Sequence, residues 1–202
     1  MTFDPNTLDW PKMDGLLPAI VQDAATGEVL MLGYMDRAAL GATLADKMVT
    51  FHSRSKNALW RKGETSGNIL DLVEVRADCD HDALLVLATP RGPTCHTGTS
   101  SCFGDDGAPG VGFIGELERV IQSRANADPT TSYTAKLLAE GPARAAQKVG
   151  EEGVETALAG RCGDDAELVS EAADLVYHLS VLLRARGVEW AGVIDELRRR
   201  HC

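Results

Sequence analysis

Three cysteines that lie close together in the sequence are the first candidates for chemistry: Cys79, Cys95 and Cys102. A catalytic zinc is usually held by three protein ligands and keeps a fourth position open for water, and three thiolates would supply such a set. The spacing from Cys95 to Cys102 is not that of a zinc finger, so spacing alone favours a structural zinc or no metal. The odd total of five cysteines disfavours a disulfide framework. Cys162 and Cys202 lie far away, and we expect no chemistry of them.

Aspartates alternate with other residues in the segment "DCDHD", residues 78–82. On an extended backbone Asp78, Asp80 and Asp82 share one face, while Cys79 points to the other. Carboxylate oxygens suit Mg²⁺, which bridges carboxylates to substrate phosphates. Three like charges repel one another, so we expect a positive group to compensate them; a solvated acidic turn is the alternative. If the segment is extended, Cys79 lies on the wrong side to join the same pocket, and we hypothesise that it completes a zinc site on a partner subunit.

Basic residues, serines and glycines are mixed in the segment "SRSKNALWRKGETSGN", residues 53–68. Side chains and backbone amides of such a segment can cradle a phosphate. An exposed basic hairpin is the alternative interpretation. The candidates for substrate binding in this segment are Arg54, Ser55, Lys62, Glu64 and Ser66.

Paired acids recur in the second half of the chain. Glu152 and Glu155 are three residues apart, as are Glu171 and Asp174, so each pair lies on one face of a helix. Most such pairs face solvent. The glycines of "KVGEEGVET" are unusual inside a helix, however, and they permit close approach of a ligand or a neighbouring helix. These acids are therefore candidates for binding a metal ion, and Glu151, four residues before Glu155, can join the first pair.

The elements that must position these residues differ between the two halves. The first half indicates a hairpin over 16–35, a helix over 36–47 capped by Asp36, and strands within 48–55, 69–80 and 83–90. The stretch 104–110, "GDDGAPG", has the composition of a linker. We therefore predict a β-rich α+β domain over 1–106 and a linker over 107–112.

Helical periodicity continues after the linker. Helices are expected over 112–126, 130–141, 142–160, 165–187 and 189–202, with Pro142 starting the third and Asp164 or Asp165 capping the fourth. In the fourth helix the expected buried stripe consists of Leu168, Ala172, Leu175, Leu179 and Leu182. This half is predicted to be an all-α domain over 113–202, a helical bundle.

Composition and charge exclude several classes of protein. The net charge of −10 argues against nucleic acid as the main partner, and 44% hydrophobic residues are enough for a folded core. The apolar runs are far shorter than a membrane span, and the N-terminus lacks the pattern of a signal peptide. We expect a cytoplasmic protein.

Five motifs, found in order over about residues 8–103, resemble the phosphoribosyl-AMP cyclohydrolase family: "GLLPAIVQD", "GEVLMLGYM", "SRSKNALWRKGETSGN", "DCDHD" and "CHTGTSSCF". The resemblance implies that Asp78, Asp80 and Asp82 bind Mg²⁺. It also implies that Cys79, Cys95 and Cys102 bind Zn²⁺ in a site shared across a homodimer, with Cys79 coming from the partner subunit, and that His96 assists proton transfer. Zinc hydroxide would attack C6 of the adenine ring, with N1 leaving. One departure is His52, where an aromatic residue is usual, and we expect it to affect stacking on the substrate.

The helical half resembles the phosphoribosyl-ATP pyrophosphatase family through "ADPTTSYTAKLL", "KVGEEGVET" and "EAADLVYHL". The resemblance implies Mg²⁺ held by Glu152, Glu155, Glu171 and Asp174, water attack on the α-phosphorus, and assembly through the helices. Glu151 is then a ligand or the base, and Lys148 is a candidate phosphate contact.

The two resemblances together predict a bifunctional enzyme of histidine biosynthesis, a homodimer that uses Zn²⁺ and Mg²⁺ on phosphoribosyl-ATP and phosphoribosyl-AMP. Two alternatives stay open. In one, a single domain is active and the other only dimerises. In the other, the chain is a zinc-stabilised nucleotide-binding regulatory module without turnover, in which the zinc has four protein ligands.

Overall fold

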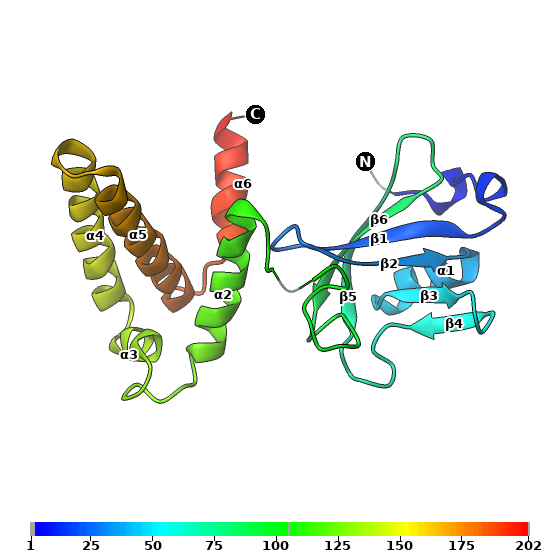
Figure 1. Cartoon of the computed structure of the whole chain (residues 1–202), viewed down its shortest axis with the longest axis horizontal. Coiled ribbons are helices and arrows are strands. Elements are labelled where there is room, and N and C mark those ends of the chain that lie inside the picture. The colour runs from blue at the N-terminus through cyan, green and yellow to red at the C-terminus, as the bar shows by residue number, and fades with distance from the viewer. Residues whose placement is uncertain (1–2, 105, 202) are drawn as a thin grey trace. The chain divides into compact units, whose positions relative to one another are not determined.

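The computed structural model describes residues 3–104 and 106–201 and divides into two compact units, one ending at Phe113 and the other beginning at Ile114 (Figure 1). The first is β-rich and the second all-helical, which confirms the predicted fold class. Within the expected linker, Gly110–Gly112 form a short 3-10 turn, η3. Cys202, at the end of the predicted last helix, lies outside the described residues.

The first unit is built on a four-stranded sheet of order β2-β1-β6-β5, with a separate two-stranded sheet of β3 and β4. The predicted hairpin is present as antiparallel β1 and β2, while β6 runs parallel to β1 and antiparallel to β5. Two short 3-10 turns precede the first strand. The elements are η1 (Pro5–Thr7), η2 (Pro11–Met13), β1 (Leu17–Asp23), β2 (Val29–Met35), α1 (Arg37–Asp46), β3 (Thr50–Ser53), β4 (Ala58–Arg61), β5 (Leu70–Ala77) and β6 (Leu84–Pro90).

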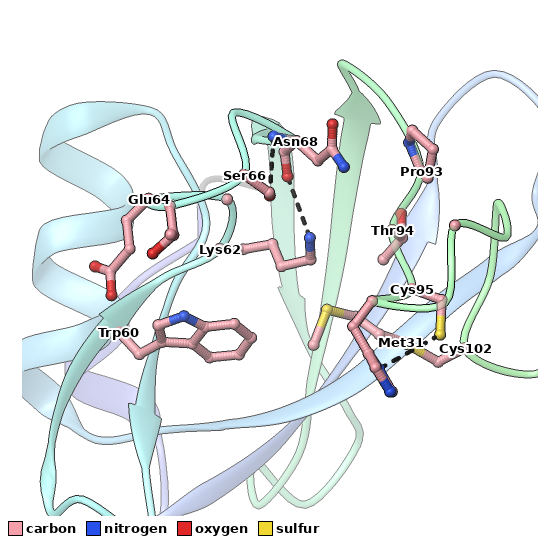
Figure 2. A pocket seen from close by; sticks show the side chains of 14 residues that line it. Met31, Trp60, Lys62, Glu64, Ser66, Asn68, Pro93, Thr94, Cys95 and Cys102 are labelled. Carbon is pink, nitrogen blue, oxygen red and sulfur yellow. Dashed lines mark hydrogen bonds between the residues drawn. The ribbon is translucent and has the colours of Figure 1, made fainter.

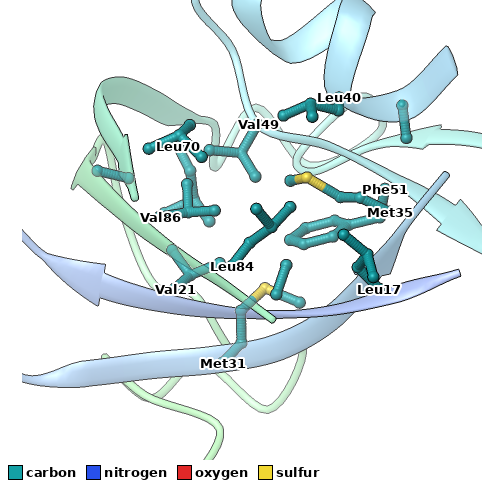
Figure 3. Close-up of a cluster of buried hydrophobic side chains, with 14 of the residues drawn as sticks. Leu17, Val21, Met31, Met35, Leu40, Val49, Phe51, Leu70, Leu84 and Val86 are labelled. Carbon is teal, nitrogen blue, oxygen red and sulfur yellow. The ribbon is translucent and has the colours of Figure 1, made fainter. Parts of the chain in front are cut away.

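The core of this unit follows from alternation along the strands. Leu17, Ala19 and Val21 of β1 are buried at every second position, because successive side chains of a strand point to opposite faces. Phe51 fills the middle of the cluster (Figure 3). A Cβ at Gly33 would lie 2.4 Å from the Phe51 ring, so only glycine fits opposite this side chain.

Two local hydrogen-bonding features start α1 and connect it to β3. The Asp36 carboxylate accepts a hydrogen bond of 2.7 Å from the Ala39 amide, as expected of an N-cap. Thr43 is fully buried; its hydroxyl donates to the Ala39 carbonyl at 2.9 Å and accepts from the Thr50 amide at 2.9 Å. Thr43 therefore connects the helix to β3.

Thr43→Val is expected to destabilise the first unit by about 1–3 kcal/mol, because it leaves the buried Thr50 amide without a partner at almost unchanged volume. Urea unfolding followed by fluorescence of Trp10 and Trp60 measures the change. Thr7→Val is the control: its exposed hydroxyl donates only to the Asp4 carbonyl at 2.8 Å, so we expect a change within about 0.5 kcal/mol. Equal effects of the two substitutions would contradict this role of Thr43.

In the described part of the chain the second unit consists of five helices, in which α4 and α5 pack along each other (Figure 1). Ser132 caps α3, and Asp164, rather than Asp165, caps α5 by accepting from the Glu167 amide at 2.9 Å. α6 is tied to α2 and to α5 through hydrogen bonds of Trp190. The helices are α2 (Phe113–Arg124), α3 (Tyr133–Glu140), α4 (Pro142–Cys162), α5 (Asp165–Ala185) and α6 (Trp190–His201).

The expected buried stripe of α5 is wrong in detail. The five residues predicted to be buried are only partly covered, and the buried side chains of this helix are His178, Ser180 and Val181. Burial requires a neighbour, and the side chains of α5 that are buried lie where α2 and α3 pack against its C-terminal half, while Val169 near its N-terminal end is exposed. Large apolar side chains are correspondingly exposed on these helices, among them Val154, Leu158 and Val169.

In the part of the chain that is described, no helix combines the length and the apolar character that crossing a membrane requires.

Candidate functional sites

The segment 78–83 is a turn between β5 and β6. The interpretation of an extended segment with Cys79 and the aspartates on opposite faces is therefore wrong. The Asp78 carboxylate accepts hydrogen bonds from the amides of Asp82 and Ala83 at 3.0 and 3.1 Å, which closes the turn. His81 adopts a left-handed conformation, with φ of 63°. The turn itself gathers the three acids.

The expected positive group beside these acids is Lys12, which sequence patterns did not identify. Its Nζ atom lies 2.5 Å from an oxygen of Asp80 and 2.5 Å from an oxygen of Asp82. Hydrogen bonds to these carboxylates raise the pKa of Lys12, and the ammonium in turn lowers the pKa of Asp80. One carboxylate oxygen from each of Asp78, Asp80 and Asp82 lies within 4.8 Å of the others. The three carboxylates of this acidic turn are close enough together to hold a metal ion.

The N-terminal segment positions Lys12 on the acidic turn. Trp10 is buried, and the Asp9 amide donates to the His81 carbonyl at 2.8 Å. Lys12 comes 68 residues before Asp80 in the sequence. No local pattern connects residues so far apart, which explains why the sequence did not reveal this contact.

Lys12→Gln is expected to tighten Mg²⁺ binding at the acidic turn by about fivefold, because an ammonium that contacts two ligand carboxylates competes with a cation. Calorimetric titration with Mg²⁺ measures the change, with Glu152→Gln present in every arm to weaken the helical cluster by one carboxylate. Lys56→Gln, on an exposed turn, is the control with unchanged affinity. Weaker binding after Lys12→Gln would instead mean that the lysine supports the metal.

A cavity of about 400 Å³ lies at the far end of the same sheet (Figure 2). Two of the three candidate cysteines line it, together with the apolar side chain of Met31 and the indole of Trp60, which offers a flat surface to an aromatic ring. Arg54 and Ser55 are not among its lining residues, and Arg54 lies over the Tyr34 ring at 3.9 Å instead. The predicted site residues that do line the cavity are His96, Lys62, Glu64, Ser66, Cys95 and Cys102.

The cavity holds one thiol that ionises easily. Hydrogen bonds from Thr97, whose hydroxyl lies 3.1 Å from the sulfur, lower the pKa of Cys95 to about 6. His96 Nδ1 is 3.8 Å from the same sulfur. Partial desolvation, together with the charge of Cys95, raises the pKa of Cys102. The thiolate is the reactive and metal-binding form of cysteine, and the lowered pKa of Cys95 favours this form near neutral pH.

Lys62 extends along the cavity wall, where burial lowers the pKa of its ammonium. Its Nζ atom donates to the Asn68 carbonyl at 3.2 Å (Figure 2). The loop between them needs Gly63, which has φ of 82° and where a Cβ would lie 2.4 Å from the Asn68 backbone. The glycines of this segment therefore shape the loop that carries Lys62, Glu64 and Ser66.

The third cysteine, Cys79, is remote from this cavity. It lies in the turn 78–83, which joins the end of β5 to the start of β6. The cavity begins at the opposite end of these two strands, where the Arg91 amide donates to the Ile69 carbonyl. β6 has seven residues, which at roughly 3.3 Å per residue separates the ends by about 20 Å. Within one chain, neither Cys79 nor the aspartates reach Cys95 and Cys102.

His52 does not line the cavity, so the expected effect on substrate stacking has no support in its position. It pairs with Leu59 across the hairpin, while its neighbour Phe51 faces the core. Its Nδ1 atom lies 2.8 Å from the second oxygen of Asp36. His52 therefore contacts the carboxylate that caps α1.

The second acidic cluster lies between α4 and α5. Carboxylate oxygens of Glu152, Glu171 and Asp174 lie within 4.8 Å of one another, and Glu152 is buried. Glu155 is outside this group of three, although the charge of Glu152 raises its pKa. The cluster has the spacing of a metal site built on two facing helices.

Basic and amide groups surround the glutamates of α4. Lys148 Nζ lies 2.6 Å from Glu152 and 2.9 Å from Glu151, and these hydrogen bonds lower the pKa of both carboxyl groups. Glu151 also accepts from the Gln147 amide at 2.8 Å. Glu151 thus points toward the basic side chains, and it is not a member of the three-acid group.

A buried histidine, His178, belongs to this cluster and was missed by sequence reasoning. Its Nδ1 atom lies 2.9 Å from the Asp174 carbonyl and 3.6 Å from a Glu152 oxygen. Tyr133 contacts its Nε2 atom at 3.3 Å. In the sequence, His178 stands out only as a polar residue next to Leu179, a member of the predicted buried stripe.

The folds and sites define a class of protein: a β-rich domain with a thiol-lined cavity joined to an all-α domain with an acidic cluster. Residues 31–104 match the phosphoribosyl-AMP cyclohydrolase family, and residues 114–201 match the phosphoribosyl-ATP pyrophosphohydrolase family. The chain belongs to the bifunctional histidine-biosynthesis enzymes that join these two hydrolase domains.

Relatives of this kind cover almost the whole chain. The histidine biosynthesis bifunctional protein HisIE of Escherichia coli is 60% identical over 194 residues, which are 96% of this chain and 95% of that protein. The proteins of the same name from Salmonella typhimurium and Photobacterium profundum are 59% and 54% identical; each match covers 96% of this chain, with 95% and 97% of the respective protein. The order of the two domains agrees with the order of the folds.

Proposed function

We propose that the two units catalyse consecutive hydrolytic steps. The helical unit hydrolyses phosphoribosyl-ATP to phosphoribosyl-AMP and pyrophosphate. The first unit then opens the adenine ring of phosphoribosyl-AMP between N1 and C6. The observation that carries the second assignment is the cavity that places Cys95, Cys102 and His96 beside a wall able to accept a flat ring.

The first site is proposed to be shared between two subunits. Cys95 and Cys102 would hold zinc in the cavity together with Cys79 of the partner subunit, since within one chain Cys79 is at the other end of the sheet. The depressed pKa of Cys95 supports this assignment, because the thiolate is the form that binds zinc. When bound, zinc supplies a water of lowered pKa for attack on the ring carbon.

Because the three aspartates lie in the same turn as Cys79, they would also lie at the cavity of the partner subunit. Asp78, Asp80 and Asp82 would then hold Mg²⁺ near a substrate phosphate, although within their own chain they are remote from the cavity. Lys62, Glu64 and Ser66 orient the substrate, and His96 transfers a proton to or from the reacting ring.

The surface of the sheet supports a second copy of the chain as the partner. Ile20 and Leu32 pair across β1 and β2 and are 39% and 45% exposed. Exposed apolar side chains on α4 and α5 give the helical unit a similar surface. We propose a homodimer; its cytoplasmic location stays a prediction.

In the helical unit we propose Mg²⁺ held by Glu152, Glu171 and Asp174, with Glu155 joining from the next turn of α4. Lys148 would bind the phosphates of the substrate, and Glu151 is a further ligand or the base. The buried position of Glu152 supports its role, because a buried carboxylate is retained only when cations or donors surround it.

Sequential removal and return of metals tests this assignment. After treatment with a chelator, Mg²⁺ alone is expected to restore pyrophosphate release from phosphoribosyl-ATP, so that phosphoribosyl-AMP accumulates. Addition of Zn²⁺ is then expected to start ring opening, which is monitored through the change in absorbance of the adenine ring. Ring opening with Mg²⁺ alone would contradict the zinc assignment, and release of pyrophosphate without any divalent ion would contradict the magnesium assignment.

A further inference from the structure

His178 is held from three helices at once. It belongs to α5, is 5% exposed, and contacts the Asp174 carbonyl of its own helix at 2.9 Å. Glu152 approaches the same Nδ1 atom from α4 at 3.6 Å, and the Tyr133 hydroxyl of α3 lies 3.3 Å from Nε2. The ring of Tyr177 packs edge-on, with centroids 5.0 Å apart. Both nitrogens of this buried ring are therefore engaged, and its orientation is restrained.

The contacts determine where the ring carries a proton. The two oxygens near Nδ1, the Asp174 carbonyl and the Glu152 carboxylate, act as acceptors. Nδ1 therefore carries hydrogen and donates to the carbonyl. At 3.6 Å the contact with Glu152 is longer than a hydrogen bond, so it is an electrostatic attraction between the N–H group and the carboxylate.

Glu152 also contacts the Glu155 carboxyl of its own helix, and its closest neighbour is the ammonium of Lys148 at 2.6 Å. That side chain is long, and it also bonds to Glu151 at 2.9 Å. The imidazole, in contrast, is buried and held by side chains and backbone of α3 and α5. Lys148 and Glu155 have flexible side chains, so among the neighbours of Glu152 the buried ring of His178 is the one that can define a single position for its carboxylate.

We propose that His178 is a positioning residue, which orients Glu152 toward Glu171 and Asp174 so that the three carboxylates hold a divalent cation. This role rests on the metal site of the proposed function. Partners of metal ligands contribute 10–100-fold to metal affinity, so loss of the Nδ1 donor is expected to weaken binding of a divalent cation at this cluster by more than about tenfold.

The test measures Mn²⁺ affinity by the magnetic resonance signal of the free ion, in the full chain. Asp80→Asn and Asp82→Asn are present in every arm, so that the helical cluster is the site observed. His178→Leu removes the donor, and His178→Gln places an amide near the Tyr133 hydroxyl but leaves the Nδ1 position without a donor. His178→Asn places an amide N–H where Nδ1 was.

We expect His178→Leu and His178→Gln to weaken Mn²⁺ binding more than about tenfold, and His178→Asn to stay within about threefold of the unsubstituted histidine. Tyr133→Phe, which removes only the contact at Nε2 and keeps the Nδ1 donor, is expected to weaken Mn²⁺ binding less than either donorless variant. Circular dichroism verifies that each variant is folded, and the glutamine arm covers the case in which leucine disturbs folding. The Mn²⁺ concentration for half-maximal pyrophosphate release should rise in parallel, with little change in the KM for phosphoribosyl-ATP.

Normal affinity in both donorless variants would overturn the proposal. An asparagine variant as weak as the leucine variant would also overturn it, because packing rather than the donor would then be responsible. If the chain with His178 intact binds no Mn²⁺ at this cluster, and Glu152→Gln changes nothing, the metal assignment itself fails. That outcome is distinct from binding that is present but insensitive to His178.

Discussion

A mixture of chains carrying Cys79→Ala with chains carrying Cys102→Ala is expected to regain ring-opening activity that neither variant has alone. Each variant by itself should lose at least roughly a hundredfold in ring opening, because each would lack a proposed zinc ligand in both sites of the proposed dimer. In a mixed dimer, the intact Cys95 and Cys102 of one chain meet the intact Cys79 of the other. Random pairing of equal amounts then restores about one quarter of the full activity, one intact site in half of the dimers.

Control measurements distinguish a site shared between subunits from a site within one chain and from misfolding. Both single variants should still release pyrophosphate from phosphoribosyl-ATP, since the helical unit is unchanged. Cys162→Ala, at an exposed cysteine of α4, is the control and should retain both activities. Co-expression of the two variants ensures mixed dimers. A mixture without activity, or a Cys79→Ala variant that opens the ring, would contradict a site completed by the partner.

Glu152→Gln is expected to abolish pyrophosphate release, by at least roughly a hundredfold, while ring opening persists when phosphoribosyl-AMP is supplied directly. The side chain is buried, keeps its volume after substitution, and is the member of the acidic cluster that both Lys148 and His178 contact. Removing its charge removes a proposed Mg²⁺ ligand and leaves the ammonium of Lys148 beside the cluster with one partner fewer.

The matched control is Glu167→Gln, an exposed glutamate in the first turn of α5, which should leave pyrophosphate release unchanged. Glu155→Gln gives a second comparison. A loss as large as that of Glu152→Gln would make Glu155 a full ligand, and a small loss would restrict the ligands to the group of three. Simultaneous loss of ring opening in a folded Glu152→Gln protein would contradict independent sites.

Local features of the fold were predictable because their causes lie within a few residues. The Asp36 cap of α1, the hairpin of β1 and β2 and the Asp164 cap of α5 depend on turns and caps whose partners are near in sequence. The boundary between strand-rich and helical halves follows in the same way from a change of hydrophobic period.

Features that depend on distant neighbours were not predictable. Alternation in "DCDHD" indicated a strand, but Asp78 bonds the amides that follow it and closes a turn. The stripe expected on α5 is half-covered because burial depends on which helix packs there. Lys12 reaches its acids across 68 residues, and no periodicity within a segment reports such a contact.

Residue identities were enough to define which thiols, carboxylates and bases the chain contains and which short segments carry them. That is a consequence of residue identity and local spacing alone. The fold was needed to show how these groups are distributed, with Cys79 and the aspartates at one end of the sheet and Cys95 and Cys102 at the other. The reason is physical: a strand carries its two ends about 20 Å apart whatever residues they bear, so proximity in sequence does not become proximity in space.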